Sequence, residues 1–142
     1  MSPTETVRRL YACFAAGDLQ AVLKLLDPHV EWITPPTLPW SRGTYRGRDE
    51  VSSYFEDFGS ALERPAVVPD RILDCGGVVV ALGRESGQAR QTGHAFSVPF
   101  AHVLTVNAGQ ITSLRGHVDT ATICAAFDPH GVSAEPSATS LA

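Results

Sequence analysis

The spacing of apolar residues along the chain changes once, from a helical repeat to an alternating one. In the first part, apolar side chains recur at helical spacing, which predicts helices through 7–14, over 19–26 and from 48 onward. Thr4 or Thr6 is expected to cap the first of these helices, and Asp18 the second. A short strand is predicted over 30–34. From Ala66 the repeat is two, which predicts strands over 66–73, 78–84, 91–106 and 111–119, followed by a helical turn over 120–127.

Helices grouped ahead of a run of antiparallel strands are typical of an α+β fold. The predicted strand over 91–106 is too long for a flat sheet in a chain of 142 residues, so it must bend, with Pro99 as a bulge or edge point. We therefore expect one domain over residues 1–127, a curved mixed sheet wrapped around the N-terminal helices in the shape of a cone. A bent sheet with helices against its concave side is expected to leave a mostly apolar cavity for a small hydrophobic molecule. The Ser-, Ala- and Pro-rich segment 128–142 is expected to be a flexible tail.

Composition narrows the possible partners to small molecules. The net charge is −4 and there is no basic run, so a nucleic-acid partner lacks its electrostatic footprint. No apolar stretch approaches the roughly 20 residues of a membrane span, and the polar start is unlike a signal peptide, so we expect a cytoplasmic protein. Three scattered cysteines and unpaired histidines indicate neither a disulfide framework nor a metal site. No cofactor motif is present, so any chemistry is expected to be cofactor-free.

His102 is the polar residue that stands out in the predicted sheet. Side chains two apart in a strand share a face, and His102 shares its face with Phe100 and Leu104 on a strongly apolar stripe. A buried imidazole needs a hydrogen-bond partner, so His102 is either a structural histidine or a catalytic group that faces the cavity. The candidate partner is Asp119, because a carboxylate can orient a histidine for proton transfer; alternatively, Asp119 caps the helical turn that follows.

Other candidates follow from the predicted strand and helix faces. If Val78, Val80 and Leu82 point inward, Arg84 does too and can hold a substrate oxygen; alternatively, it forms a salt bridge at the rim with Glu85 or Asp74. The tight hairpin at 107–109 is expected to bring Arg115 and His117 near His102. Candidate substrate-binding and lid residues, each of which plain packing would also explain, are Glu31, Trp32, Thr34, Trp40, Tyr45, Tyr54, Phe58 and Phe100.

The order of five short motifs resembles the SnoaL-like branch of the nuclear transport factor 2-like superfamily. These motifs are Gly17-Asp18, Asp27-Pro28-His29-Val30-Glu31-Trp32, Tyr45-Arg46-Gly47-Arg48-Asp49-Glu50-Val51, Pro99-Phe100-Ala101-His102-Val103 and the segment 109–119. The resemblance implies a cone-shaped α+β barrel, usually dimeric through the outer face of its sheet. It also implies relatives that include polyketide cyclases, limonene-epoxide-hydrolase-like enzymes and ketosteroid-isomerase-like enzymes.

The resemblance places the cyclases' pocket histidine at His102, but Gly116 stands where their catalytic aspartate falls. Compared with the epoxide hydrolases of this fold, Arg84 matches their arginine. Ser86 and Gly116 stand where those enzymes have two carboxylates, and Trp32 and Thr34 stand where they have two water-positioning residues.

The resulting hypothesis is a cofactor-independent cyclase or isomerase of a small hydrophobic, polyketide-like intermediate, acting by epoxide opening or aldol-type ring closure. His102 takes the proton, with Asp119 or Glu31 nearby and Tyr45 or Arg84 as the second group. The alternatives are a limonene-epoxide-hydrolase-like hydrolase and a ligand-binding or assembly module without turnover.

Overall fold

The computed structural model describes residues 1–131. Its elements, in chain order, are α1 (Pro3–Ala15), α2 (Leu19–Lys24), β1 (Leu26–Ile33), β2 (Thr44–Arg46), α3 (Gly47–Ala61), β3 (Leu62–Asp74), β4 (Val78–Ala89), β5 (Ala95–Asn107), β6 (Gln110–Val118) and α4 (Thr120–Ala126). Most of the tail predicted to be flexible, residues 132–142, lies outside the described residues.

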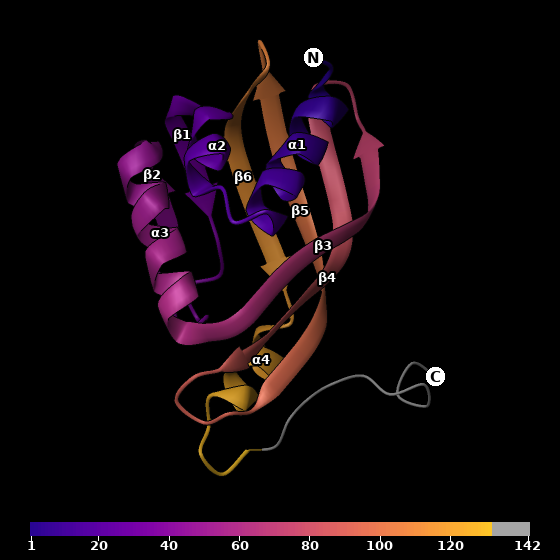
Figure 1. The fold of residues 1–142 in the computed structure, drawn as a ribbon. Coiled ribbons are helices and arrows are strands. Elements are labelled where there is room, and N and C mark those ends of the chain that lie inside the picture. The colour runs from indigo at the N-terminus through magenta and orange to yellow at the C-terminus, as the bar shows by residue number, and fades with distance from the viewer. Residues whose placement is uncertain (132–142) are drawn as a thin grey trace.

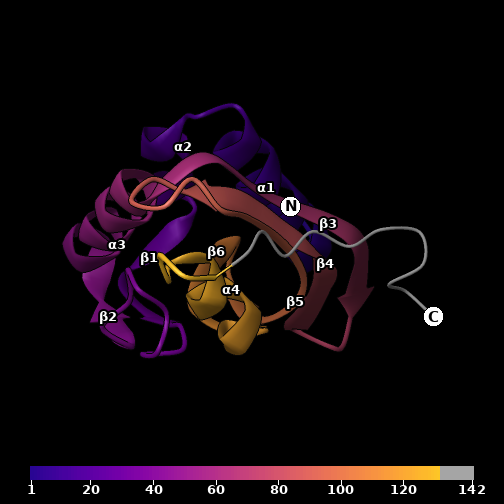
Figure 2. The ribbon, with the colours of Figure 1, turned by 90° about the horizontal axis from the view of Figure 1, so that it is seen from below.

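The six strands form one curved sheet in the order β2-β1-β6-β5-β4-β3. All neighbouring pairs are antiparallel except β1 and β6, which run parallel. Helices α1, α2 and α3 lie over one face of the sheet, and α4 lies at its lower end (Figure 1). Seen from below, the sheet bends around the centre of the molecule (Figure 2). The α+β prediction with a curved mixed sheet is confirmed; we call the helix-covered face the inner face and the opposite one the outer face.

The helix starts are fixed by side-chain caps. Ser2 caps α1 in a reciprocal capping box with Glu5, so the prediction that Thr4 or Thr6 caps it was wrong. Asp18 caps α2 as predicted, by accepting from the backbone N–H of Ala21.

The alternation in β5 was predicted correctly, but that in β4 was predicted one residue out of phase. Phe96, Val98, Phe100 and Leu104 of β5 are buried on the inner face. In β4 the buried positions are the odd-numbered ones: Val79, Ala81, Gly83, Glu85 and Ala89. The even-numbered positions, which were expected to face inward, lie on the outer face. The shift places Glu85, not Arg84, on the inner face.

Pro99 marks an edge rather than a bulge. The pairing of β4 with β5 runs without interruption past Arg84 and Pro99, whereas pairing of β5 with β6 begins only at Phe100. Because proline has no N–H to donate, it fits a strand position that has a ladder on one side alone.

Close approach of β3 to β4 shapes the inner face beside Glu85. At Gly83, a Cβ atom would overlap the carbonyl oxygen of Val68, and the β3 pairing shifts register between Pro69 and Arg71. Only glycine allows the two backbones to come this close. The glycine at position 83 is therefore required by the path of β3.

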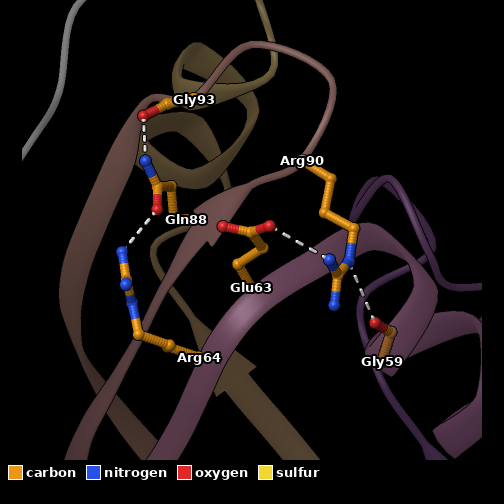
Figure 3. A network of polar contacts seen from close by, with 6 residues as sticks. All are labelled: Gly59, Glu63, Arg64, Gln88, Arg90 and Gly93. Atoms are coloured by element: carbon orange, nitrogen blue, oxygen red, sulfur yellow. Dashed lines mark hydrogen bonds and ion pairs between the residues drawn. The ribbon is translucent and has the colours of Figure 1, made fainter.

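A polar network at the lower rim joins the end of α3 to β3 and β4 (Figure 3). Arg90 forms an ion pair with Glu63, and its Nε donates to the carbonyl of Gly59. Arg64, which has a positive φ of 49° beside the first β3 bulge, donates to Gln88 at 2.7 Å. Exposed pairs of this kind contribute little free energy, so the network mainly fixes how β3 leaves the helix.

Candidate functional site

A pocket lies between the inner face of the sheet and helices α1 and α3. Its volume is about 50 Å³, and its walls are mainly apolar. The lining residues are Leu10, Tyr11, Phe14, Val22, Trp32, Thr34, Tyr54, Phe55, Phe58, Val67, Glu85, His102 and Leu114. The cavity predicted from the bent sheet is therefore present.

Glu85 is the charged residue in the pocket wall. It is 7% exposed and forms no hydrogen bond or ion pair with any described residue. Burial raises the pKa of its carboxyl from 4.5 to about 7, because the charged form loses its hydration. A buried acid without a partner costs stability, and such groups gather at functional sites. Sequence reasoning considered Glu85 only as a salt-bridge partner of Arg84, and the out-of-phase alternation hid its position.

His102 lies on the inner face and is held by Tyr11 of α1. The Tyr11 hydroxyl and His102 Nδ1 are 2.6 Å apart, and the two rings stack with centroids 5.9 Å apart. Burial lowers the pKa of His102 to about 3, so the ring is neutral near pH 7. Its Nε2 has no partner among the described residues. Burial, reinforced by the charge of Glu85, raises the pKa of Tyr11 well above its usual value, so this hydroxyl stays protonated too.

The Tyr11–His102 pair keeps one proton free for a ligand, whichever tautomer the ring adopts. If Nδ1 carries the proton and donates to Tyr11, the Tyr11 O–H is free to donate elsewhere. If Tyr11 donates to Nδ1, the proton sits on Nε2 and can be donated instead. A neutral donor therefore faces the pocket in both cases.

The opposite wall contains hydroxyl groups that already form hydrogen bonds and one indole N–H that does not. Trp40 Nε1 donates to the Tyr54 hydroxyl at 3.2 Å, and the Thr34 and Ser41 hydroxyls are 2.6 Å apart. Burial, with a contribution from the charge of Glu85, raises the pKa of Tyr54 above its usual value. Trp32 Nε1 is buried without a hydrogen-bond partner among the described residues.

Several predicted wall residues do line the pocket. Trp32 of β1 and Thr34, which directly follows the end of that strand, both face the pocket as expected, and Tyr54 and Phe58 face it from α3. Phe100 and Trp40 are not among the lining residues. Phe100 packs against the rings of Tyr11 and His102, with centroids 6.1 and 4.2 Å away. Trp40 is buried, donates to the Tyr54 hydroxyl and stacks on Phe96, so it does not form a lid.

Four other candidates lie on the outer face, away from the pocket. Arg84 donates to the hydroxyl and carbonyl of Ser97, so the prediction that it points inward was wrong. Arg115 and His117 pair with Val103 and Ala101 but are exposed on the face opposite to His102. Glu31 forms an ion pair with Arg46 at 3.5 Å. The hairpin brings these strands together, but a neighbour one residue out of register points to the other side.

Tyr45 is fully buried and does not form a lid. Its hydroxyl accepts a hydrogen bond from the backbone N–H of Arg42, and the Arg42 guanidinium lies 4.7 Å from the ring centroid. Gly116 pairs directly with His102, and a Cβ atom there would lie 3.4 Å from its Cδ2 atom. The imidazole therefore covers the position where the resemblance places an aspartate.

Asp119 is an exposed helix cap, the alternative that the sequence left open. Its carboxylate accepts from the backbone N–H of Thr122 at 3.1 Å and from the Thr122 hydroxyl at 2.6 Å, and these bonds lower its pKa. It makes no contact with His102.

Replacing Asp119 with alanine is expected to destabilise the fold by about 1 kcal/mol, because α4 loses its cap. The stabilisation by this carboxylate is present above its unfolded pKa and is lost as pH falls through its lowered folded value. Urea denaturation of both proteins at neutral and acidic pH measures the loss. Ligand binding in the pocket should be unchanged; weakened binding would contradict the assignment of Asp119 as a cap.

An apolar groove of about 410 Å³ lies beside the pocket, between the α1–α2 turn, α3 and β3. It shares Phe14, Phe55, Phe58 and Val67 with the pocket wall. Leu19 and Val68 are exposed along it. The groove therefore adjoins the pocket wall.

Within residues 1–131 there is no group of His, Cys, Asp or Glu side chains arranged to hold a metal ion. No helix in the same range is long and apolar enough to cross a membrane.

Comparison with known proteins gives the family. The sequence model of the SnoaL-like domain matches residues 7–114. An uncharacterised protein of Mycobacterium tuberculosis (strain H37Rv) is 31% identical over 112 residues, which is 78% of this chain and 83% of that protein. The chain belongs to the SnoaL-like family.

Solved structures agree with this assignment. An NTF2-like protein from Burkholderia thailandensis superimposes on this SnoaL-like chain with a TM-score of 0.86 and 32% identity, covering 91% of this chain and 99% of that one. A putative SnoaL-like polyketide cyclase from Jannaschia sp. gives a TM-score of 0.76 at 20% identity, covering 87% and 90% of the two chains, and shares the fold.

Proposed function

We propose that this SnoaL-like protein is a cofactor-independent acid–base enzyme. In this proposal it isomerises or cyclises a small, largely apolar carbonyl compound, such as a polyketide-like intermediate. The observation that carries the proposal is Glu85, a carboxyl group 7% exposed and unpaired among the described residues, in the wall of an apolar pocket. A general base works best when its pKa lies near the working pH, and the raised pKa of Glu85, about 7, meets that condition.

The proposed reaction begins when Glu85 takes a proton from the carbon next to the substrate carbonyl. The C–H electron pair forms a C=C bond, and the carbonyl π electrons move to the oxygen. That oxygen accepts a hydrogen bond from the free donor of the Tyr11–His102 pair, and this bond stabilises the developing negative charge. Neutral buried acids serve as donors to enolates in ketosteroid isomerase, so this pair is suited to the role.

The proton on Glu85 then completes either outcome. In an isomerisation, Glu85 returns it to another carbon of the conjugated system. In a ring closure, the nucleophilic carbon attacks a second carbonyl within the substrate, and the new alkoxide oxygen takes the proton. Both routes restore Glu85 and need no co-reactant. The sequence hypothesis gave the basic role to His102, but a pKa of about 3 makes that ring a poor base.

The alternative of an epoxide hydrolase requires a carboxylate within reach of His102 or Arg84. Arg84 is bonded to Ser97 on the outer face, so for this alternative the carboxylate would be Glu85, which lines the same pocket as His102. A binding module without turnover is an outcome that the following experiment distinguishes.

Hydrogen–deuterium exchange tests the proposal without knowledge of the natural substrate. Small cyclic enones and 1,3-diketones are incubated with the protein in D₂O, and loss of the acidic C–H signal is followed by proton NMR. The wild type should accelerate exchange for at least one compound, and Glu85→Gln should reduce that acceleration by about 10²–10⁴-fold. Compounds that bind without exchange, or equal exchange by the variant, would contradict the proposal.

A further inference from the structure

The pocket carries an ionisable carboxyl group but no positive side chain to balance it. None of its lining residues is Lys or Arg. Arg84, next to Glu85 in sequence, lies on the outer face and is bonded to Ser97. When Glu85 is ionised, its charge is therefore left without a counter-ion in an apolar cavity, which is an unfavourable state that a bound cation would relieve.

The rest of the wall is unusually aromatic. Six rings line the pocket, from α1, β1 and α3: Tyr11, Phe14, Trp32, Tyr54, Phe55 and Phe58. Phe55 lies at the centre of this group, with centroids 5.5 Å from Trp32, 5.5 Å from Tyr54 and 5.8 Å from Phe14. The faces of aromatic rings carry negative potential and attract organic cations.

We propose that the pocket binds a small methylated ammonium ion, with Glu85 as its counter-ion and the six aromatic rings around its methyl groups. The combination of aromatic rings and one carboxylate is the recognised chemistry for quaternary ammonium groups. The volume of about 50 Å³ is small, so the part of a ligand that enters the pocket must be a compact head group.

The hydrogen-bond pattern favours a methylated ammonium over a primary one. A primary ammonium has three N–H donors to satisfy. Besides Glu85, the side-chain oxygen atoms in the pocket belong to the hydroxyl groups of Tyr11, Thr34 and Tyr54, and each of them already makes one hydrogen bond, so few acceptor positions are left for three N–H donors. Methyl groups need no acceptors and instead contact the rings. The rest of a longer ligand would extend into the adjoining groove, which shares Phe14, Phe55 and Phe58 with the pocket.

This inference uses the same carboxyl group as the proposed function, but it does not depend on turnover. Cation binding needs only an ionised Glu85, whereas proton transfer needs a basic one that meets an acidic C–H bond. The two can therefore fail separately.

The test compares choline with its uncharged isostere 3,3-dimethylbutan-1-ol, which replaces the ammonium nitrogen by carbon. Binding to the full chain is measured by ligand-observed NMR and calorimetry at about pH 8.5 and about pH 5.5, at constant ionic strength. At the higher pH, choline should bind at least about tenfold more tightly than the alcohol. At the lower pH this preference should disappear, because Glu85 is protonated and neutral.

The other titratable groups that face Glu85 do not change charge in this range. Burial raises the pKa values of Tyr11 and Tyr54 and lowers that of His102 to about 3. Glu85→Gln should abolish the preference for choline at both pH values while retaining the fold by circular dichroism. Glu63→Gln, at the exposed rim and paired with Arg90, is the matched control and should bind like the wild type.

Two results would overturn the inference. In the first, choline binds the wild type at about pH 8.5 no more tightly than the isostere does, or does not bind at all. In the second, the preference for choline survives in Glu85→Gln. If choline shows the expected preference but no ketone undergoes hydrogen–deuterium exchange, the proposed function is wrong and this inference is supported.

Discussion

Replacing Glu85 with glutamine is expected to remove proton transfer and, at the same time, to stabilise the folded protein above about pH 7. The folded pKa of Glu85, about 7, is higher than its ordinary value of 4.5. Between these values the folded state keeps a proton that the unfolded chain has released, so stability from this group falls as pH rises from about 4.5 to about 7. The difference in pKa corresponds to about 3 kcal/mol. Glutamine has nearly the same shape and no charge, so it avoids this cost.

Urea denaturation of both proteins at about pH 5 and about pH 8 measures this effect. The difference in the free energy of unfolding between variant and wild type should increase from the lower to the higher pH by about 2–3 kcal/mol. His102 changes stability with pH in the opposite direction. Below about pH 6.5 the unfolded chain binds a proton on this histidine, whereas the folded ring stays neutral until about pH 3. Both proteins retain His102, so its contribution cancels in the difference.

A rise in stability combined with a loss of activity is the mark of a residue kept for function at the expense of the fold. The matched control is Glu63→Gln, whose carboxylate is exposed, and this change should leave the pH dependence as in the wild type. If Glu85→Gln is destabilised at both pH values by the same amount, the carboxyl group has a structural partner and the account of the site is wrong.

Replacing Tyr11 with phenylalanine is the second change with a large expected effect. It leaves Nδ1 of a buried histidine without its partner, at a cost of about 1–3 kcal/mol. It also disrupts the donor that faces the substrate oxygen, so kcat for any exchange reaction should fall by about 10²–10³-fold. The pH profile of kcat/KM should still show an inflection near pH 7, because Glu85, the proposed base, is untouched.

A double-mutant cycle with His102→Leu separates this hydrogen bond from simple packing. If the 2.6 Å contact is a real interaction, the two changes together should cost less than the sum of their separate effects, by about 1 kcal/mol or more. Additive costs, together with a wild-type kcat in Tyr11→Phe, would show that the pair neither interacts nor acts on the substrate.

The sequence predicted the fold well because the helical and alternating repeats were strong. It also placed His102 correctly, since the polar ring interrupts a face of β5 that is otherwise apolar from Phe96 to Val106. In β4 the run Val78–Leu82 is apolar at every position, so hydrophobicity does not distinguish the inner face from the outer one. The larger side chains suggested one face, but the other is buried, with small residues at Ala81 and Gly83 where β3 and the helices approach closely.

That single ambiguity explains most of the difference between the predicted and the observed site. Because of it, Arg84 was predicted to point into the cavity, and the position of the Glu85 carboxyl group in the pocket wall was not predicted. Of the two roles that the sequence left open for Asp119, the structure shows the cap: the side chain lies beyond the end of β6 and caps α4, so the hairpin does not bring it to His102. A signal was available in the sequence, namely an acid directly after a predicted strand and two residues beyond a glycine.

The most direct test of the account is an NMR titration of the Glu85 carboxyl group. Protein with ¹³C-labelled glutamate is titrated from about pH 3 to about pH 9, and the Glu85 carboxyl signal is assigned by its absence in Glu85→Gln. We expect this signal to titrate near pH 7, well above the value of about 4.3 usual for a glutamate. A midpoint near 4.3 would mean that Glu85 is solvated or paired, and it would contradict both the catalytic role and the cation site.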